Sequence, residues 1–325
     1  MNISKRWDVQ KEEVGINLHT YFRGKIPLLP SSLIYKYIRT KKIKVNGQRT
    51  THNYKLQEED VVQAYIGDDF FQEVTKENAF LYVKDHKLSI VYENKDLLLV
   101  DKKPGTLCNQ SDDELFSSLQ TQAQAYLYSK GEIKLESDFL PCLCNRLDRN
   151  TGGIVIIAKN PESKNIIDEK IRCHEIDKYY LCIVHGKPTL KKGILEHQLF
   201  KDEKNNIVTV SKKRRVGTKT AITEYELLES SDGLSLIQCR LITGRTHQIR
   251  AQMAYIGHPL LGDGKYGRNS MNKNFGIWSQ QLYSYKILFS FKNEAGILEC
   301  LNNKSFTVQS IPFKASLFTK NIEAL

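Results

Sequence analysis

Asp148 is a carboxylate whose neighbours in the sequence could support nucleophilic chemistry. It lies in the stretch 145–153 (NRLDRNTGG), between Arg146 and Arg149. Flanking arginines keep a carboxylate ionised, which a nucleophile requires. In an extended backbone side chains alternate, so Arg146, Asp148 and Asn150 are expected to share one side. The glycine pair that ends the stretch permits a tight path into a following strand. Taken alone, however, such a stretch is more often an ordinary salt-bridged surface aspartate.

A second stretch, 178–186 (KYYLCIVHG), has the pattern of a strand with two adjacent tyrosines. Tyrosines in an isolated strand most often serve sheet packing. A functional tyrosine here would either stack on a base or accept a proton, and the residues alone leave both roles open.

A third stretch, 241–250 (LITGRTHQIR), crosses a strand end, a glycine turn and a helix start. Helix N-termini favour anions, so Arg245 before the helix and Arg250 within it are candidates for binding a phosphate or a carboxylate. His247 and Arg250 are three residues apart and share a helix face. The alternatives are a hydrogen-bonded structural histidine and a plain ion pair.

The elements that must position these stretches follow from hydrophobic periodicity and turn signals. Strands outnumber helices and do not alternate regularly with them, which predicts an α+β domain with a mixed sheet. The expected strands are 88–91, 97–100, 154–158, 179–184, 220–229 and 234–242, and the expected helices are 114–128 and 246–256.

The first part of the chain has the pattern of a small basic module. A helix is expected at 33–38, followed by a strand at 42–47 that ends in an Asn-Gly hairpin turn. Between residues 31 and 55 there are seven basic residues and no acidic one. A solvated charged face is the usual interpretation of such a run, but a shared helix-and-hairpin scaffold favours a surface that follows phosphates. The candidate contacts are Lys36, Arg39, Lys42 and Lys44.

Composition narrows the class of protein. Lys and Arg number 48 against 37 Asp and Glu, a net charge of +11, and such an excess favours polyanionic partners through counterion release. The seven cysteines include no C-x-x-C pair, so neither a disulfide framework nor a zinc site is expected. This cysteine usage favours a protein of the reducing cytoplasm. The N-terminus lacks the apolar core of a signal peptide, and no apolar run is long enough to span a bilayer. We expect a soluble cytoplasmic protein with no membrane association.

Several motifs, taken in order, resemble those of the RluA-type pseudouridine synthases over roughly residues 85–290. The stretch 145–153 looks like that family's His-Arg-Leu-Asp-x-x-Thr-Ser-Gly, with Asn145 and Gly152 in place of His and Ser. The Lys-x-Tyr-Leu strand, Thr-Gly-Arg-Thr-His-Gln-Ile-Arg at 243–250 and Gly-His-Pro-Leu-Leu-Gly-Asp at 257–263 follow. The segment 92–105 is similar to the family's opening motif.

The segment 33–62 resembles an S4-type RNA-binding domain, a common companion of this family. It departs from the pattern where Asn17-Leu18-His19 replaces the usual opening Arg-Leu-Asp, so an early RNA contact is expected to be missing. The resemblance divides the chain into an S4-type domain at 1–75, a linker at 76–87 and a catalytic domain at 88–325. It also implies that the sheet of the catalytic domain is largely antiparallel.

By this resemblance the protein isomerises uridine in structured RNA, with ribosomal RNA favoured over transfer RNA. Asp148 would attack the nucleotide at the sugar or the ring, Tyr180 would stack on the flipped uracil and assist proton removal, and Arg250 would pair with Asp148. Arg146 would hold the displaced nucleotide. The further RNA contacts would be Arg149, Arg245, His247 and Gln248. A monomer is expected. No cofactor is expected, since the isomerisation neither hydrolyses nor oxidises anything.

Two other classes of protein fit the residues less well. A non-catalytic RNA-binding or ribosome-assembly factor would have no need for an aspartate among phosphate-seeking arginines. An RNA methyltransferase needs a glycine-rich cofactor loop after a strand. The segment 262–267 matches G-x-G-x-x-G but follows a helix and a His-Pro pair instead, and a poor helix start follows it.

Overall fold

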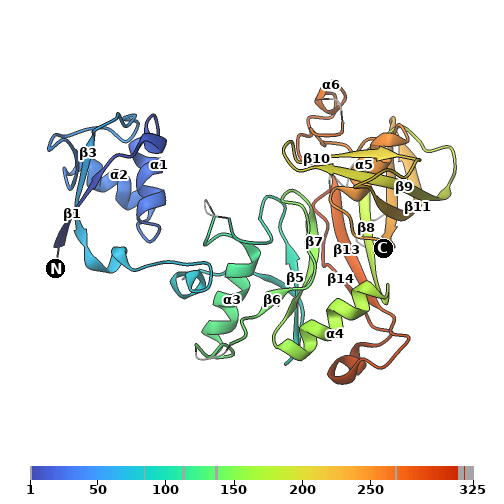
Figure 1. Ribbon diagram of the computed structural model, residues 1–325. Helices are drawn as coiled ribbons and strands as arrows, with labels where there is room; N and C mark the ends of the chain where they lie inside the picture. Colours follow the sequence, from blue (N-terminus) through green and yellow to red (C-terminus); the bar gives the residue numbers. More distant parts are fainter. Residues whose placement is uncertain are drawn as a thin grey trace. The chain divides into compact units, whose positions relative to one another are not determined.

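The computed structural model describes residues 2–83, 85–111, 114–135, 138–267, 269–313 and 318. The chain divides into two compact units, which are described separately (Figure 1). The first comprises Met1–Lys84 and Gln110–Phe116, and the second Asp85–Asn109 and Ser117–Leu325. The domain division expected from the sequence stays a prediction. Most of the last 12 residues of the expected catalytic domain lie outside the described part of the chain.

The first unit is a three-stranded antiparallel sheet with two helices packed on it. Its strand order is β1-β3-β2, and Phe22, Ile34 and Val62 lie fully buried in its core. The predicted hairpin turn is confirmed, since Asn46 and Gly47 have φ angles of 52° and 73°. The elements are β1 (Asn2–Asp8), α1 (Leu18–Lys25), α2 (Ser31–Arg39), β2 (Ile43–Val45) and β3 (Val61–Gly67), with 3-10 turns η1 (Lys11–Glu13), η2 (Asp68–Phe71) and η3 (Ala79–Tyr82).

The second unit is built on an 11-stranded sheet, with the main order β10-β9-β11-β12-β8-β13-β7-β5-β4. β13 pairs in parallel with β7, and the other strand pairs among the described residues are antiparallel. The predicted α+β class with a mixed, largely antiparallel sheet is confirmed. The strands are β4 (Ser89–Glu93), β5 (Leu97–Lys102), β6 (Cys142–Leu143), β7 (Gly152–Ala158), β8 (Ile176–His185), β9 (Lys192–Asp202), β10 (Ile207–Ser211), β11 (Lys219–Ser231), β12 (Leu234–Leu241), β13 (Leu282–Phe289) and β14 (Ser305–Thr307).

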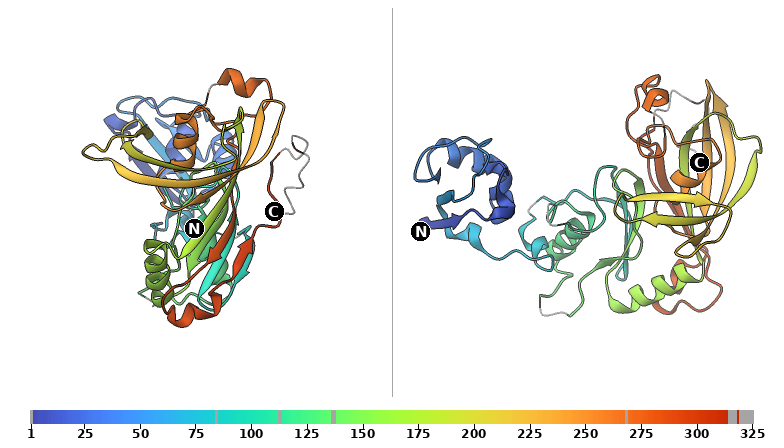
Figure 2. Two further views of the ribbon diagram at one scale, coloured as in Figure 1. Left: turned by 90° about the vertical axis from the view of Figure 1, so that its right-hand side faces the viewer. Right: turned by 45° about the horizontal axis from the view of Figure 1, so that its top comes forward.

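Most helices of the second unit lie near the two ends of its central strands, whereas the first of them, α3, lies beside β6 (Figure 1). Figure 2 shows α4 and η4 near one end and α5 and α6 near the other. The sequence did not predict α4, although Asn160 caps it and Pro161 opens it. The helices of the second unit are α3 (Leu119–Ser129), α4 (Pro161–Arg172), α5 (Gln248–Tyr255), α6 (Asn269–Lys273) and the 3-10 helix η4 (Gly296–Leu301).

Two predicted helix starts were wrong. α3 begins at Leu119 and not at 114, because the Ser118 side chain accepts a hydrogen bond from the Thr121 backbone and caps the helix there. α5 begins at Gln248 and not at 246, because His247 takes a left-handed conformation with φ of 51°. The residues after the glycine-rich segment were expected to start a helix poorly, and the helix found there, α6, has five residues.

The core of the second unit lies between this sheet and its covering segments. Every residue of β7 is buried, and Ile156, Ile183 and Leu236 are fully enclosed. A strand buried on both faces is continuously apolar instead of alternating, which explains the run that the sequence shows at 154–158. Among the described residues, no helix combines the length and the apolar character needed to cross a membrane.

Candidate active site

Asp148 lies in the loop between β6 and β7, residues 144–151, called here the Asp148 loop. The predicted alternation covers 146–148 only: Arg146 is exposed, Leu147 is buried and the Asp148 side chain is 26% exposed. The backbone then turns, with the N–H of Thr151 donating to the carbonyl of Asp148. The extended backbone that was expected to place Asn150 on the same side as Arg146 and Asp148 therefore does not reach Asn150.

Buried groups hold the Asp148 loop from behind. The Oδ1 atom of Asn145 accepts a 2.7 Å hydrogen bond from the backbone N–H of Ile156 in β7. Asn145, which departs from the family motif, thus fixes the loop to the central sheet. The Sγ atom of Cys108 lies 3.2 Å from the backbone nitrogen of Leu147.

Lys102, at the end of β5, is a further anchor of this loop. Its Nζ atom donates to the carbonyls of Thr106 and Arg149, at 2.9 and 3.0 Å. The residue is 1% exposed, and burial lowers the pKa of Lys102 to about 8. The carbonyl of the residue that follows Asp148 is therefore held by a buried amine.

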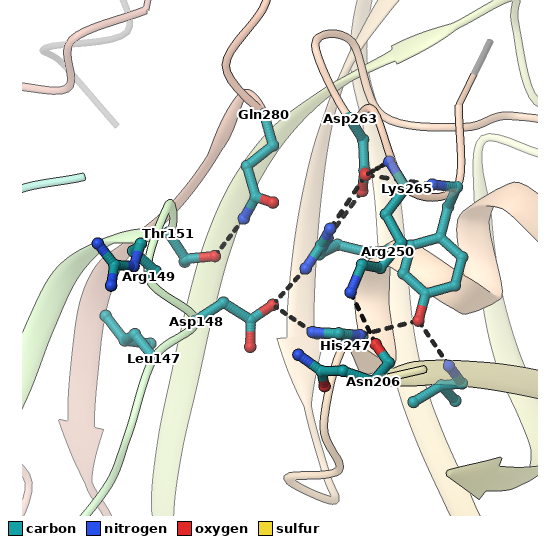
Figure 3. A network of polar contacts seen from close by, with 12 residues as sticks. Leu147, Asp148, Arg149, Thr151, Asn206, His247, Arg250, Asp263, Lys265 and Gln280 are labelled. Atoms are coloured by element: carbon teal, nitrogen blue, oxygen red, sulfur yellow. Dashed lines mark hydrogen bonds and ion pairs between the residues drawn. The ribbon is translucent and has the colours of Figure 1, made fainter. Parts of the chain in front are cut away.

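Arg250 joins Asp148 to a second carboxylate, as Figure 3 shows. Its Nη1 atom lies 2.8 Å from Oδ2 of Asp148, and its Nε and Nη2 atoms lie 2.7 and 3.0 Å from the two oxygens of Asp263. The expected pairing of Arg250 with Asp148 is thus present. A two-point contact between a guanidinium and a carboxylate fixes both position and orientation, so Asp263 aims Arg250 at Asp148.

Asp263 is buried and ionised. Burial alone would raise its pKa, but the hydrogen bonds from Arg250 and from the backbone N–H groups of Lys265 and Tyr266 outweigh this effect and lower the pKa of Asp263. Asp148 and Asp263 thus both contact the guanidinium of Arg250.

His247 lies on the other side of Asp148. Its Nε2 atom is 3.8 Å from Oδ2 of Asp148, and its Nδ1 atom is 2.8 Å from the hydroxyl of Tyr266. That hydroxyl accepts a hydrogen bond from the backbone N–H of Val208 in β10. Lys265 donates to the carbonyl of Asn206, in the turn between β9 and β10. The β9–β10 hairpin therefore forms one wall of the site.

The remaining predicted residues of the second unit differ in burial: two are buried and two are exposed. Tyr180 in β8 is 5% exposed, and burial, with the charge of Asp148 adding to it, raises the pKa of Tyr180. Gln248 is 3% exposed, and its amide bonds to Thr223 and three other groups of the protein. Arg149 and Arg245 are exposed.

Gly152, the second departure from the family motif, faces an aromatic ring. A Cβ atom at this position would lie 2.2 Å from the ring of Tyr283, whose hydroxyl donates to Asp101. The position has no room for a serine while Tyr283 is there. Next to it, Thr151 accepts a 2.6 Å hydrogen bond from Gln280.

The predicted residues of the first unit include two that line a pocket of about 410 Å³, Lys36 and Arg39. Lys42 and Lys44 lie over the rings of Tyr37 and Tyr65, at 5.0 and 5.7 Å from the ring centres. Such contacts hold the two ammonium groups over aromatic faces.

Sequence reasoning missed the roles of Asp263, Tyr266 and Lys102. Asp263 and Tyr266 both lie in the segment 262–267, whose glycine pattern resembles a dinucleotide fingerprint without its structural context. A usable signal was present, because Asp263 ends the family motif at 257–263.

Comparisons with known proteins identify the family of this chain. A family model described as RNA pseudouridylate synthase matches residues 96–255. Over 312 residues the chain is 31% identical to an uncharacterized RNA pseudouridine synthase of Mycoplasma capricolum, covering 91% of this chain and 94% of that protein. Over 277 residues it is 27% identical to ribosomal large subunit pseudouridine synthase C of Vibrio parahaemolyticus, covering 85% and 82%.

Solved structures share the fold. The human RNA pseudouridylate synthase domain containing 1 superposes with a TM-score of 0.55 at 20% identity, covering 76% of this chain and 89% of that one. The chain belongs to the RNA pseudouridine synthase family. Within that family it is of the RluA type, and it forms pseudouridine in RNA.

Proposed function

We propose that this enzyme modifies large-subunit ribosomal RNA, as a monomer, with Asp148 as the nucleophile and with the target uridine flipped out of the RNA. The observation that carries the nucleophile is the geometry of Asp148, a partly exposed carboxylate that buried Arg250 holds at 2.8 Å. An ionised, oriented carboxylate at the surface of a basic protein has the state that nucleophilic attack requires.

The partial exposure of the Asp148 side chain supports base flipping. Chemistry on a base requires the base to leave its stack, and the exposed Arg146 could occupy or hold the gap that remains. A tyrosine with a raised pKa stays protonated at neutral pH. We therefore assign Tyr180 to packing against the uracil, and not to accepting a proton as a phenolate.

The test of the nucleophile is Asp148→Asn, which preserves the shape of the side chain. We expect pseudouridine formation to be abolished while RNA affinity is retained, measured by product analysis and by a binding titration. The matched control is Asp168→Asn, since Asp168 is a partly exposed carboxylate paired with Lys164 in α4. Normal product formation by Asp148→Asn would show that the assignment is wrong.

The choice of RNA rests on relatives. Those of Vibrio cholerae and Pasteurella multocida, 28% identical to this chain, are named ribosomal large subunit pseudouridine synthase C. Mapping pseudouridines in total RNA with and without the gene tests this proposal. We expect the lost sites to lie in large-subunit ribosomal RNA, and sites lost only from transfer RNA would contradict it.

We also propose that the first unit is an S4-type RNA-binding domain and that its pocket contacts the RNA. Three cationic side chains and no carboxylate are found among the described residues that line the pocket. Tyr35 there is 46% exposed and stacks on His19 with ring centres 4.6 Å apart. An open aromatic ring among cations suits a base and its phosphate. The lining residues are Ser32, Tyr35, Lys36, Ile38, Arg39, Arg49, Thr50, Thr51 and His52.

A further inference from the structure

His247 is held in a way that simple contact with RNA does not explain. Its φ of 51° is left-handed, a conformation that non-glycine residues adopt rarely and that is retained where the surrounding structure enforces it. The residue is 9% exposed, so little of it is available to RNA. Its two ring nitrogens instead face two defined protein groups, Asp148 and Tyr266.

The Tyr266 hydroxyl sets the tautomer of this histidine. The hydroxyl oxygen accepts from the backbone N–H of Val208 at 2.8 Å, and its single proton is left to donate. Nδ1 of His247, also at 2.8 Å, is its partner among the described residues. Donation of that proton to Nδ1 leaves the hydrogen of a neutral imidazole on Nε2. That hydrogen faces Asp148.

Burial of the ring favours its neutral form. Burial lowers the pKa of His247, and the cations of Arg250 and Lys265 lower it further, while Asp148 and Asp263 act in the opposite direction. The net direction is downward. The guanidinium of Arg250 also lies 5.2 Å from the centre of the Tyr266 ring, which helps to fix that ring.

The two oxygens of Asp148 are not equivalent in this setting. Oδ2 is bonded to Nη1 of Arg250 and faces Nε2 of His247. Oδ1 has no hydrogen bond to the described part of the chain, and Figure 3 shows one oxygen of Asp148 without a dashed line. A carboxylate oxygen with two donors is less nucleophilic than its free neighbour.

We propose that His247 is a positioning residue, which donates from Nε2 to Oδ2 of Asp148 and so leaves Oδ1 as the reacting oxygen. The inference rests on the proposed nucleophile. Catalytic hydrogen bonds are often long before substrate binds and tighten afterwards, so the 3.8 Å separation is expected to shorten in the RNA complex. The role differs from the RNA contact that the sequence suggested for His247.

The first test compares His247→Leu, which has no donor, with His247→Gln, whose amide can reach the position of Nε2. We expect the leucine variant to lose roughly 10- to 100-fold in kcat, as for other residues that orient a reacting group, with KM for RNA unchanged. The glutamine variant should recover most of that loss. His174→Gln is the matched control, because His174 also has a left-handed φ, 57°, but is exposed.

Equal losses in the glutamine and leucine variants would overturn the proposal. So would a change confined to KM, because it would restore the interpretation of His247 as an RNA contact.

The second test observes the tautomer directly. Nitrogen-15 NMR of histidine-labelled full-length protein, with His247 identified by its absence from the His247→Gln spectrum, should show hydrogen on Nε2. Tyr266→Phe keeps the ring but removes the hydroxyl, so we expect a share of the Nδ1–H form and a several-fold lower kcat at unchanged KM. Hydrogen on Nδ1 in the unmodified protein would contradict the inference.

The two proposals can fail separately. An active Asp148→Asn variant would remove the nucleophile but leave the NMR result as it is. An Nδ1–H tautomer would remove the role of His247 while Asp148 could still be the nucleophile.

Discussion

At the scale of single residues, a buried amine holds the Asp148 loop. Lys102 is enclosed, yet it is the donor to the carbonyl of Arg149. An amine whose pKa falls to about 8 on folding from its ordinary 10.5 opposes the folded state while it is protonated. The stability of the second unit should therefore depend on pH in an alkaline range.

Lys102→Met tests this dependence. Between about pH 8 and 10.5 the unfolded chain still binds a proton that folded Lys102 has lost, so the free energy of unfolding rises with pH. From pH 7 to 9.5 the unmodified protein should gain roughly 2 kcal/mol relative to the variant, measured by urea unfolding at both pH values. Lys103→Met, at the exposed neighbour, should not change the dependence. A parallel response of protein and Lys102 variant would contradict the prediction.

Gly152 gives a second prediction at this scale. Gly152→Ser, which restores the usual family residue, should cost about 1–3 kcal/mol of unfolding free energy because its Cβ would overlap the Tyr283 ring. In a Tyr283→Ala background the same change should cost far less, and a double-mutant cycle by urea unfolding measures the coupling. Gly24→Ser is the control, since a Cβ at Gly24 meets nothing within 4 Å. Additive effects would show that the ring is not the cause.

At the scale of elements, the β9–β10 hairpin organises the site from the edge of the sheet. β10 is the last strand in the order, and its Val208 N–H points away from β9 to the hydroxyl of Tyr266. An edge strand has backbone groups without strand partners, and here one of them fixes a side chain beside Asp148. If His247 has the proposed role, the hairpin supports catalysis through a backbone group, which residue types alone do not reveal.

Val208→Pro tests this contribution, because proline removes the N–H and is tolerated at sheet edges. We expect kcat to fall several-fold, since Tyr266 loses the bond that directs its proton to His247. Val208→Ala keeps the N–H and serves as the control, which should lower stability through reduced burial but preserve kcat. Steady-state kinetics on both variants give the comparison, and equal kcat values would refute the role of the backbone group.

How far the sequence could predict these elements and this site depends on the range of the interactions. β7 and the β11–β12 hairpin were predicted because apolar runs and turn signals are local. The start of α5 was misplaced because His247 is left-handed, and the groups that its ring nitrogens face, Tyr266 and Asp148, belong to other segments of the chain. The Asp148–Arg250 pair was predicted from the family resemblance. The hydrogen bond between Val208 and Tyr266 is a tertiary contact, which no local sequence pattern records.

At the scale of the whole molecule, a net charge of +11 makes RNA binding an electrostatic process. Three cationic side chains line the pocket of the first unit: Lys36, Arg39 and Arg49. Neutralising them should weaken binding without touching the Asp148 loop.

The triple change Lys36→Ala, Arg39→Ala and Arg49→Ala tests that prediction. The slope of log K against log salt should fall by about 0.7–0.9 for each phosphate that the variant no longer neutralises, measured by RNA titration at several salt concentrations. The control changes Lys11, Lys76 and Lys95 to alanine, three lysines outside the pocket lining. Equal slopes in the pocket variant and the unmodified protein would mean that the pocket does not meet phosphate.

The chain passes between its two units more than once, because 110–116 belongs to the first unit although it is inserted between β5 and α3 of the second. Gln110 donates to the carbonyl of Lys76 within the first unit. A single cleavage near residue 84 would therefore leave one piece of the first unit attached to the larger fragment. The two fragments should co-purify as a complemented pair, and a gene split at this position should still yield an assembled enzyme.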